Sequence, residues 1–185
     1  MKEKIQPWKT IESKYVLDSK YIKIRQDKVV LPDGTIYDEY YVHDRPGWAA
    51  IFCLTEDGKV ILNRQYKHGI GQVVLELPAG SIELDDKDTK ETIMRELEEE
   101  TGYQVKNVEL IGKFIIDPTF SSGWVWVYFA SGGSLTGKQQ KDAREIINIE
   151  LVTPNELLER VRKGEINVQG HVAAIYLTLD KKGLL

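Results

Sequence analysis

The feature of the sequence that most constrains the fold is a Pro-Ala-Gly turn that leads into an acidic helix. Residues 78–103 read PAGSIELDDKDTKETIMRELEEETGY. Asp88 with Glu91 three residues later has the pattern of a capping box, and Gly102 is a typical residue at a helix C-terminus. The sequence therefore predicts a helix that begins at Asp88 and ends at Gly102, joined to the turn by a loop.

Three glutamates of this predicted helix share one face. Residues at positions i, i+3 and i+4 are neighbours on a helix surface, so Glu96, Glu99 and Glu100 converge, whereas Glu98 points almost the opposite way. Like charges at this spacing repel one another, and the repulsion is stronger away from water. A divalent cation reverses the repulsion, because Mg²⁺ binds carboxylate and carbonyl oxygens together with substrate phosphate. A solvated acidic helix face is the simpler alternative.

The composition narrows the class of protein. The net charge is −4, so a nucleic-acid backbone is not expected as the main partner. The sequence shows neither an apolar run long enough to span a membrane nor a secretory signal, so we expect a cytoplasmic protein without a membrane partner. The single cysteine, Cys53, lies in the apolar run WAAIFCL, which indicates a core thiol. The histidines lack the spacing of metal ligands and are interpreted as structural or solvated residues, namely His43, His68 and His171.

The first third of the chain has the pattern of β-strands. Residues 15–44 contain β-branched and aromatic runs interrupted by Asp33-Gly34, which is a hairpin signal. Residues 48–66 repeat the pattern around Asp57-Gly58. Further strands are expected at about 107–116 and 124–130, and further helices at about 154–163 and 168–179. This order of elements predicts a mixed α/β fold rather than a regular doubly wound sheet.

A domain boundary is expected at Arg45-Pro46-Gly47, where turn residues separate the two hairpins. Residues 1–45 would then form a small antiparallel β unit, and residues 46–185 the main domain. A unit of about three strands cannot bury a core by itself. We therefore expect it to pack against the main domain or against a second subunit.

The acidic segment resembles the Nudix box, G-x5-E-x7-R-E-U-x-E-E-x-G-U, where U is a bulky apolar residue. Residues 95–103, RELEEETGY, match the second half of the box position by position, and Gly80 matches its first glycine. Between Gly80 and Arg95 the chain has one residue more than the pattern, and the middle acidic position falls on Asp86. Loops tolerate insertions, so this departure concerns the role of Asp86 and leaves the helix unaffected.

The resemblance implies a Nudix-type α/β/α sandwich with a mixed sheet, beside the small antiparallel β unit. It also implies hydrolysis of a nucleoside diphosphate linked to another moiety, with Mg²⁺, or Mn²⁺ in its place, polarising the phosphoryl group and activating water. Glu96 and Glu100 are the implied principal metal ligands. Glu99 is an additional ligand, and the carbonyl of Ala79 completes the set. Glu99 and Glu100 are therefore also expected to be catalytic.

Beyond the box, the chain is similar to the ADP-ribose pyrophosphatase branch of the family. The similarity includes the LPDG hairpin at 31–34, the RQYK stretch at 64–67, Pro118 fifteen positions after the box, and the GEI stretch at 164–166. In that branch the N-terminal unit is exchanged between two subunits, which implies a homodimer. ADP-ribose would be split into AMP and ribose 5-phosphate.

The same resemblance indicates where the substrate binds. In the branch, aromatic residues of the N-terminal unit stack on adenine, and the candidates for this role are Tyr21, Tyr37 and Tyr40. The other candidates for substrate binding are Arg64, Lys67, Gly80 and Pro118. Two simpler alternatives remain open, because strands favour tyrosine in any case and because Arg64 can form a surface ion pair.

A catalytic acid is expected in the loop before the strand near residue 147. Branch members usually keep a catalytic or metal-binding glutamate there, and this chain offers Asp142 and Glu145. Glu145 directly precedes the apolar pair Ile146-Ile147, which should anchor it at the start of the strand. We therefore expect Glu145 to be the catalytic residue, with Asp142 as the alternative.

Two alternative functions stay open. Many branch members have an acid shortly after the proline that corresponds to Pro118, whereas this chain reads PTFSSGWVWVYFA. The missing acid leaves room for GDP-mannose or another nucleotide sugar as the substrate. A Nudix domain that senses a ligand without hydrolysing it is the other alternative. The retained glutamates argue against it, because a pure binder has no reason to keep a repulsive cluster.

Overall fold

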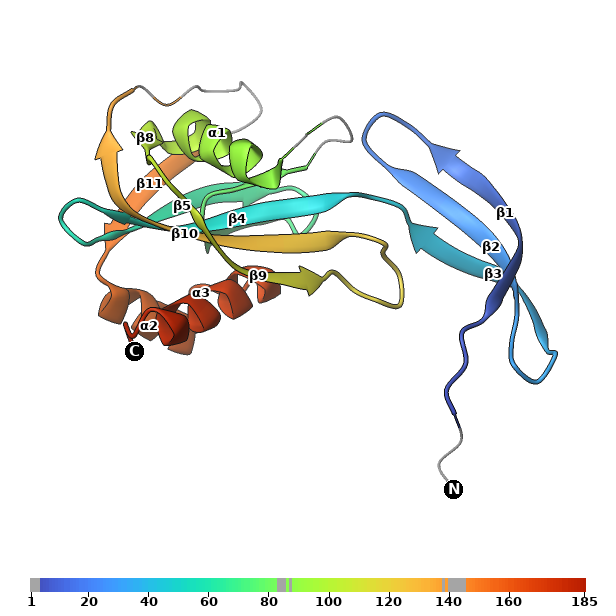
Figure 1. The fold of residues 1–185 in the computed structure, drawn as a ribbon. Coiled ribbons are helices and arrows are strands. Elements are labelled where there is room, and N and C mark those ends of the chain that lie inside the picture. The colour runs from blue at the N-terminus through green and yellow to red at the C-terminus, as the bar shows by residue number, and fades with distance from the viewer. Residues whose placement is uncertain (1–3, 83–85, 87, 138, 140–145) are drawn as a thin grey trace. The chain divides into compact units, whose positions relative to one another are not determined.

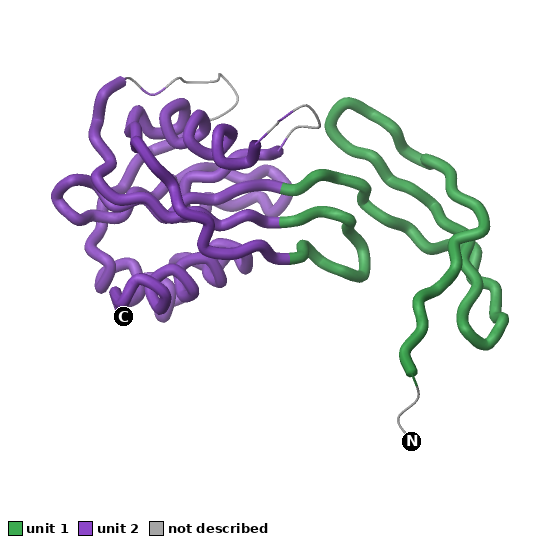
Figure 2. Tube along the Cα trace, in the orientation of Figure 1, with its two compact units in different colours: residues 1–47, 115–124 green, residues 48–114, 125–185 purple. Residues whose placement is uncertain are grey.

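The computed structural model describes residues 4–82, 86, 88–137, 139 and 146–185. The chain divides into two compact units, Met1–Gly47 with Ile115–Trp124 and Trp48–Phe114 with Val125–Leu185 (Figure 2). Among the helices of the described residues, none is long and apolar enough to cross a membrane.

The first unit is built around a three-stranded antiparallel sheet in the order β1-β2-β3. Its strands are β1 (Lys9–Asp18), β2 (Lys23–Val30) and β3 (Ile36–His43). Gly34 in the turn between β2 and β3 has φ 86°, a conformation that glycine adopts without steric strain. Every residue of the edge strand β1 is exposed, whereas the central strand β2 is partly buried, with Asp27 and Val29 each 5% exposed.

The second unit is a sandwich of helices on both faces of a mixed sheet (Figure 1). Within the described residues the sheet has eight strands, in the order β11-β5-β4-β10-β8, and β6, β7 and β9 pair with β5, β4 and β10. The strands are β4 (Gly47–Thr55), β5 (Val60–Lys67), β6 (Gln72–Glu76), β7 (Ala79–Ser81), β8 (Tyr103–Gln104), β9 (Glu109–Ile115), β10 (Trp124–Leu135) and β11 (Ile147–Val152).

Helix α1 (Thr89–Thr101) covers one face of this sheet, and α2 (Pro154–Arg162) and α3 (Gln169–Lys181) cover the other (Figure 1). The predicted fold class, an α/β/α sandwich with a mixed sheet and a small antiparallel β unit, is confirmed.

Helix α1 begins and ends where its local sequence predicts. The Asp88 carboxylate accepts the N–H of Lys90 at 2.9 Å, whereas the N–H of Glu91 bonds to the Asp88 carbonyl at 3.1 Å. At the other end Gly102 has φ 74° and its N–H bonds to the carbonyl of Glu98. Asp88 is therefore the N-cap and Gly102 the left-handed C-cap, and these two residues set the length of the helix.

The core on the α1 side of the sheet holds this helix in place. Ile93 and Leu97 of α1 are fully buried and belong to one cluster with Ile51, Cys53 and Ile61 of the sheet. Burial also raises the pKa of the Cys53 thiol to about 12, as a core thiol requires. Because the apolar side of α1 is anchored in this way, the glutamate side of the helix has a fixed position over the sheet.

Candidate active site

The turn at β7 and helix α1 are in direct contact. A Cβ atom placed on Gly80 would lie 2.2 Å from Cγ and 2.3 Å from Cδ of Glu96. A side chain at residue 80 would force Glu96 to move, because non-bonded carbon atoms do not approach closer than about 3.5 Å without strain. The absence of a side chain at residue 80 therefore allows Glu96 to lie against the backbone of the turn.

Glu100 is the most deeply buried glutamate on this face of the helix, with 8% of its surface exposed. Its Oε2 accepts the N–H of Ala79 at 3.0 Å and the Nδ2 of Asn63 at 2.9 Å. Burial raises the pKa of Glu100 to about 8, and the charges of Glu96 and Glu76 act in the same direction against the bond from Ala79. Burial, and to a smaller extent the two neighbouring carboxylates, therefore disfavour the ionised form of Glu100.

Arg95 pairs with the other two box glutamates. Its Nη2 lies 3.0 Å from Oε1 of Glu96, and its Nη1 lies 2.9 Å from Oε2 of Glu99. The guanidinium therefore spans two carboxylates on neighbouring turns of the helix. This arrangement orients both side chains on the face that also presents Glu100.

Glu76 on β6 is the centre of a second buried polar group beside Glu100. It has 4% of its surface exposed and lies directly opposite Asn63 in the β5–β6 pairing. Its Oε1 accepts the Nε2 of Gln65 at 2.7 Å and lies 2.7 Å from the Nζ of Lys67. Alternate residues of a strand face the same way, so residues 63, 65 and 67 of β5 all face α1.

His171 of α3 joins this group to the turn. Its Nδ1 accepts the N–H of Leu77 at 3.2 Å, and its Nε2 lies 3.4 Å from Oε2 of Glu76. Its ring stacks on Trp48 with the centroids 4.9 Å apart. Burial lowers the pKa of His171 to about 4, so the ring is neutral at pH 7 and Nδ1 is free to accept. The helix thereby fixes the strand end immediately before the turn.

The donor chemistry of the site fits a hard divalent cation. Buried carboxylates next to a turn with backbone carbonyls are the oxygen ligands that Mg²⁺ prefers. In the part of the chain that the structure describes, no group of three or more acidic, histidine or cysteine side chains already has the geometry of a metal site. The hydrogen bonds of Glu100 support the fit, because Asn63 and Ala79 both donate to Oε2 and so hold the carboxyl group in a fixed orientation next to the turn.

Arg64 and Lys67 lie on different faces of the sheet, although the sequence predicts both as substrate ligands. Arg64 follows Asn63 directly and therefore faces away from α1. Its Nε pairs with Glu150, which also pairs with Arg160 of α2. The structure thus brings Lys67 near Glu100 and Glu76 and does not bring Arg64 there.

In the first unit Tyr40, one of the residues predicted to bind substrate, bonds to the residue that follows Pro118, another of them. The hydroxyl of Tyr40 donates to the carbonyl of Thr119 at 2.7 Å, next to Pro118 in the chain. The Tyr40 ring makes an edge contact with Trp8 at a centroid distance of 5.8 Å. Tyr21 instead lies in the turn between β1 and β2 with 78% of its surface exposed.

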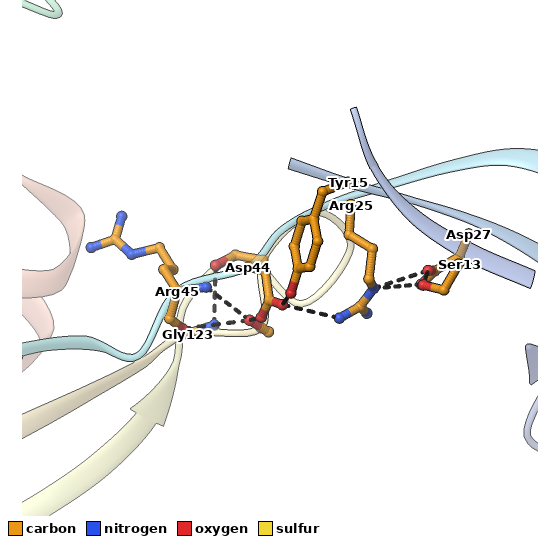
Figure 3. Close-up of polar contacts among 9 residues, drawn as sticks. Ser13, Tyr15, Arg25, Asp27, Asp44, Arg45 and Gly123 are labelled. Atoms are coloured by element: carbon orange, nitrogen blue, oxygen red, sulfur yellow. Dashed lines mark hydrogen bonds and ion pairs between the residues drawn. The ribbon is translucent and has the colours of Figure 1, made fainter. Parts of the chain in front are cut away.

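A polar cluster holds the loop before β10 against this sheet, as the converging side chains in Figure 3 show. Asp44 accepts the hydroxyls of Tyr15 at 2.7 Å and Ser122 at 2.8 Å, and these bonds lower its pKa. Arg25 reaches both Asp44, at 3.3 Å, and Asp27, at 2.9 Å. The cluster therefore links β1, β2 and the loop that contains the Tyr40 partner.

The predicted loop acids Glu145 and Asp142 lie outside the described residues. Asp86, the middle acidic position of the box, is described, and its charge acts on Arg95.

Three residues of the buried polar group beside Glu100 were not expected from the sequence, namely Asn63, Gln65 and Glu76, and His171 was expected only as a structural or solvated residue. One signal was available, because Asn63 directly follows the apolar run VIL and Glu76 interrupts the apolar run VVLELPAG. A fully buried polar residue needs a hydrogen-bond partner, so such positions point to a buried polar group.

The comparison with protein families decides the classification. The model of the NUDIX domain matches residues 43–170. The chain belongs to the Nudix family. A second model, the nucleoside diphosphate sugar hydrolase N-terminal domain, matches residues 8–43. The Nudix box resemblance is therefore confirmed, and the chain is a Nudix pyrophosphohydrolase that resembles the ADP-ribose pyrophosphatases.

Individual Nudix relatives agree with this classification. The ADP-ribose pyrophosphatase of Bacillus subtilis (strain 168) is 32% identical over 159 residues, which are 85% of each chain. The methanol dehydrogenase activator of Bacillus methanolicus is 30% identical over 177 residues, or 94% of each chain. A crystal structure of an ADP compounds hydrolase superposes with a TM-score of 0.86 over all of both chains at 19% identity, which shows the shared fold.

Proposed function

We propose that this Nudix enzyme hydrolyses ADP-ribose to AMP and ribose 5-phosphate in a reaction that depends on Mg²⁺, with Mn²⁺ as a substitute. The observation that carries the proposal is the buried Glu100 carboxylate, bonded to the N–H of Ala79 and surrounded by further negative charge. The choice of ADP-ribose is supported by the relatives that are named ADP-ribose pyrophosphatases.

The metal ligands in this proposal are Glu96, Glu99, Glu100 and the carbonyl of Ala79. A bound Mg²⁺ supplies polarisation of the pyrophosphate and activation of water. Arg95 keeps Glu96 and Glu99 on the ligand face, and the missing side chain of Gly80 lets Glu96 approach the turn. The chain itself therefore contributes orientation and charge, which are the main contributions of proteins to phosphoryl-group chemistry.

The proton acceptor is proposed to be Glu145, with Asp142 as the alternative. Glu96, Glu99 and Glu100 are assigned to the metal, so another group must accept the proton from the attacking water. A comparison of Glu145→Gln with Asp142→Asn tests the assignment. A loss of kcat confined to Asp142→Asn would show that Asp142, and not Glu145, accepts the proton.

Lys67 and the backbone at Gly80 are the proposed contacts for the pyrophosphate. Lys67 is the cation on the α1 face of β5, and its pairing with Glu76 holds the ammonium close to the carboxylate cluster. Arg64 is left out of this set, because its partner Glu150 lies on the opposite face of the sheet.

Recognition of the nucleotide is proposed to involve a homodimer. The sheet of the first unit exposes large apolar side chains, namely Trp8, Ile11, Tyr15, Val16, Leu17, Tyr21, Ile36, Tyr37 and Tyr41. An exposed apolar area of this kind marks an interaction surface, and a two-fold partner is the commonest solution. We propose that Tyr40 and Pro118 of one subunit serve the nucleotide site of its partner. A mass near the monomer value in light scattering at micromolar concentration would contradict this.

Another nucleotide sugar, such as GDP-mannose, is the second candidate substrate. The observation in its favour is the match of residues 8–43 to a nucleoside diphosphate sugar hydrolase domain, which names a wider class than ADP-ribose. A panel of ADP-ribose, ADP-glucose and GDP-mannose with Mg²⁺, scored for AMP or GMP by chromatography, ranks the candidates. Tight binding of one compound without product would instead identify a ligand-sensing domain.

A further inference from the structure

Asn63 is a fully buried amide in the apolar interior of the second unit. It follows the fully buried Leu62 in β5 and lies directly opposite Glu76 in the β5–β6 pairing. Its Nδ2 donates to Oε2 of Glu100 at 2.9 Å, and its Oδ1 is buried without a hydrogen-bond partner among the described residues. Of the two polar atoms of the amide, only Nδ2 is therefore hydrogen-bonded, and its partner belongs to the box helix.

An apolar residue in this place would avoid that unfavourable state. A buried acceptor without a partner lowers the free energy of unfolding by about 1–3 kcal/mol. An apolar group of the same shape does not carry this desolvation penalty. Neighbouring positions of the strand hold Ile61 and Leu62, so the environment accepts apolar side chains. The asparagine amide therefore has a role other than filling the core.

The geometry around Glu100 indicates that role. Asn63 and the backbone N–H of Ala79 both donate to the same oxygen, Oε2, from two different strands. Two donors on one oxygen fix the plane of a carboxylate and leave the other oxygen for a further ligand. Partners of this kind hold ligating side chains in position at metal sites.

We propose that Asn63 is a positioning residue that holds the Glu100 carboxylate for a divalent cation. This inference rests on the proposed metal-dependent function, and it assigns a role to a side chain outside the Nudix box. The Asn63 amide acts only through Glu100. Its loss should therefore weaken cation binding without abolishing it, by about 10-fold, the lower end of the usual effect of such partners.

The test is the affinity of the full-length protein for Mn²⁺, measured by titration with electron paramagnetic resonance of the free ion. Asn63→Leu keeps the branched shape and removes the donor, and about 10-fold weaker binding is expected. If the leucine variant does not fold, Asn63→Val replaces it in the same titration, because strands accommodate valine well. The expected loss of affinity is the same.

Thr178→Val is the matched control. Thr178 of α3 is also fully buried with an unpartnered oxygen, its Oγ1, but no described hydrogen bond joins it to the box glutamates. Removing that oxygen should leave Mn²⁺ affinity at the wild-type value. Thermal unfolding in metal-free buffer should be cooperative for all variants.

The outcomes separate this inference from the proposed function. If wild type binds Mn²⁺ and the Asn63 variants bind it equally well, the positioning role is wrong and the metal proposal stands. An equal loss in Thr178→Val would also overturn the role, because it would reflect a general effect on the core. If wild type binds no Mn²⁺, the metal-dependent function fails and the inference fails with it.

Discussion

The side chain of Glu96 lies against the backbone of Gly80, in the space that a Cβ atom would occupy in any other residue. This contact joins the β7 turn to the box helix, and Glu100 reinforces it one helical turn later through its bond to Ala79. The relative position of turn carbonyls and helix carboxylates is therefore set by packing before any ligand binds.

Gly80→Ala should disturb this arrangement. The added methyl group would overlap Glu96, so the side chain or the turn must move, and we expect a loss of activity of up to about 100-fold. Overpacking should also lower the free energy of unfolding by roughly 1–3 kcal/mol. Gly69→Ala is the control, because a Cβ at Gly69 meets nothing within 4 Å. Equal kcat values for the two variants would show that the contact does not matter.

Glu100→Gln should lower kcat by at least about 100-fold, because loss of even an indirect partner of a metal site costs 10–100-fold. The amide is isosteric and can still accept from Ala79 and Asn63, so circular dichroism should be unchanged. Glu98→Gln is the control, because Glu98 bonds to Gln104 away from this cluster. A near-normal rate for Glu100→Gln would identify the helix as a solvated acidic face.

Acid should destabilise the protein through His171. Its pKa is about 4 when folded and near 6.5 when unfolded, so the unfolded state binds more protons between these values. Stability is therefore complete above pH 6.5 and falls by roughly 3 kcal/mol as the pH drops to 4. Urea unfolding across this range should show a smaller pH dependence in His171→Gln than in wild type or in His68→Gln. Identical pH dependence in all three would contradict the assignment.

Lys67 and Arg64 should differ in their effects on catalysis. Lys67→Gln should raise KM for the substrate, because it removes a cation beside the carboxylate cluster. Arg64→Gln should leave KM close to wild type and change stability by no more than about 1 kcal/mol, as expected for a part-exposed ion pair with Glu150. A larger KM effect for Arg64→Gln would show that Arg64 reaches the substrate after all.

Local signals made the box helix predictable. Asp88 and Gly102 act within a few residues of the helix ends, and the i, i+3, i+4 spacing places the glutamates on one face without reference to the rest of the chain. The Thr153–Glu156 capping box of α2 was predictable for the same reason. Such patterns need no knowledge of the fold.

The long-range contacts that hold Glu100 and the strand end before the turn could not be predicted from local patterns. Asn63 and Glu100 are 37 residues apart, and Leu77 and His171 are 94 apart, so their contacts depend on strand register and helix packing. The same register decides that Arg64 faces away from α1, and a shift of one residue would reverse the assignment. Family resemblance treated residues 64–67 as one stretch and did not separate these faces.

The measurement that tests the account most directly is the release of AMP from ADP-ribose by the chelator-treated wild-type enzyme, before and after addition of Mg²⁺. The carboxylates of Glu96 and Glu99 should repel the anionic pyrophosphate until a cation is present. We expect no AMP in metal-free buffer, and formation of AMP and ribose 5-phosphate once Mg²⁺ or Mn²⁺ is added. Undiminished turnover in metal-free buffer, or no product with either metal, would contradict the account.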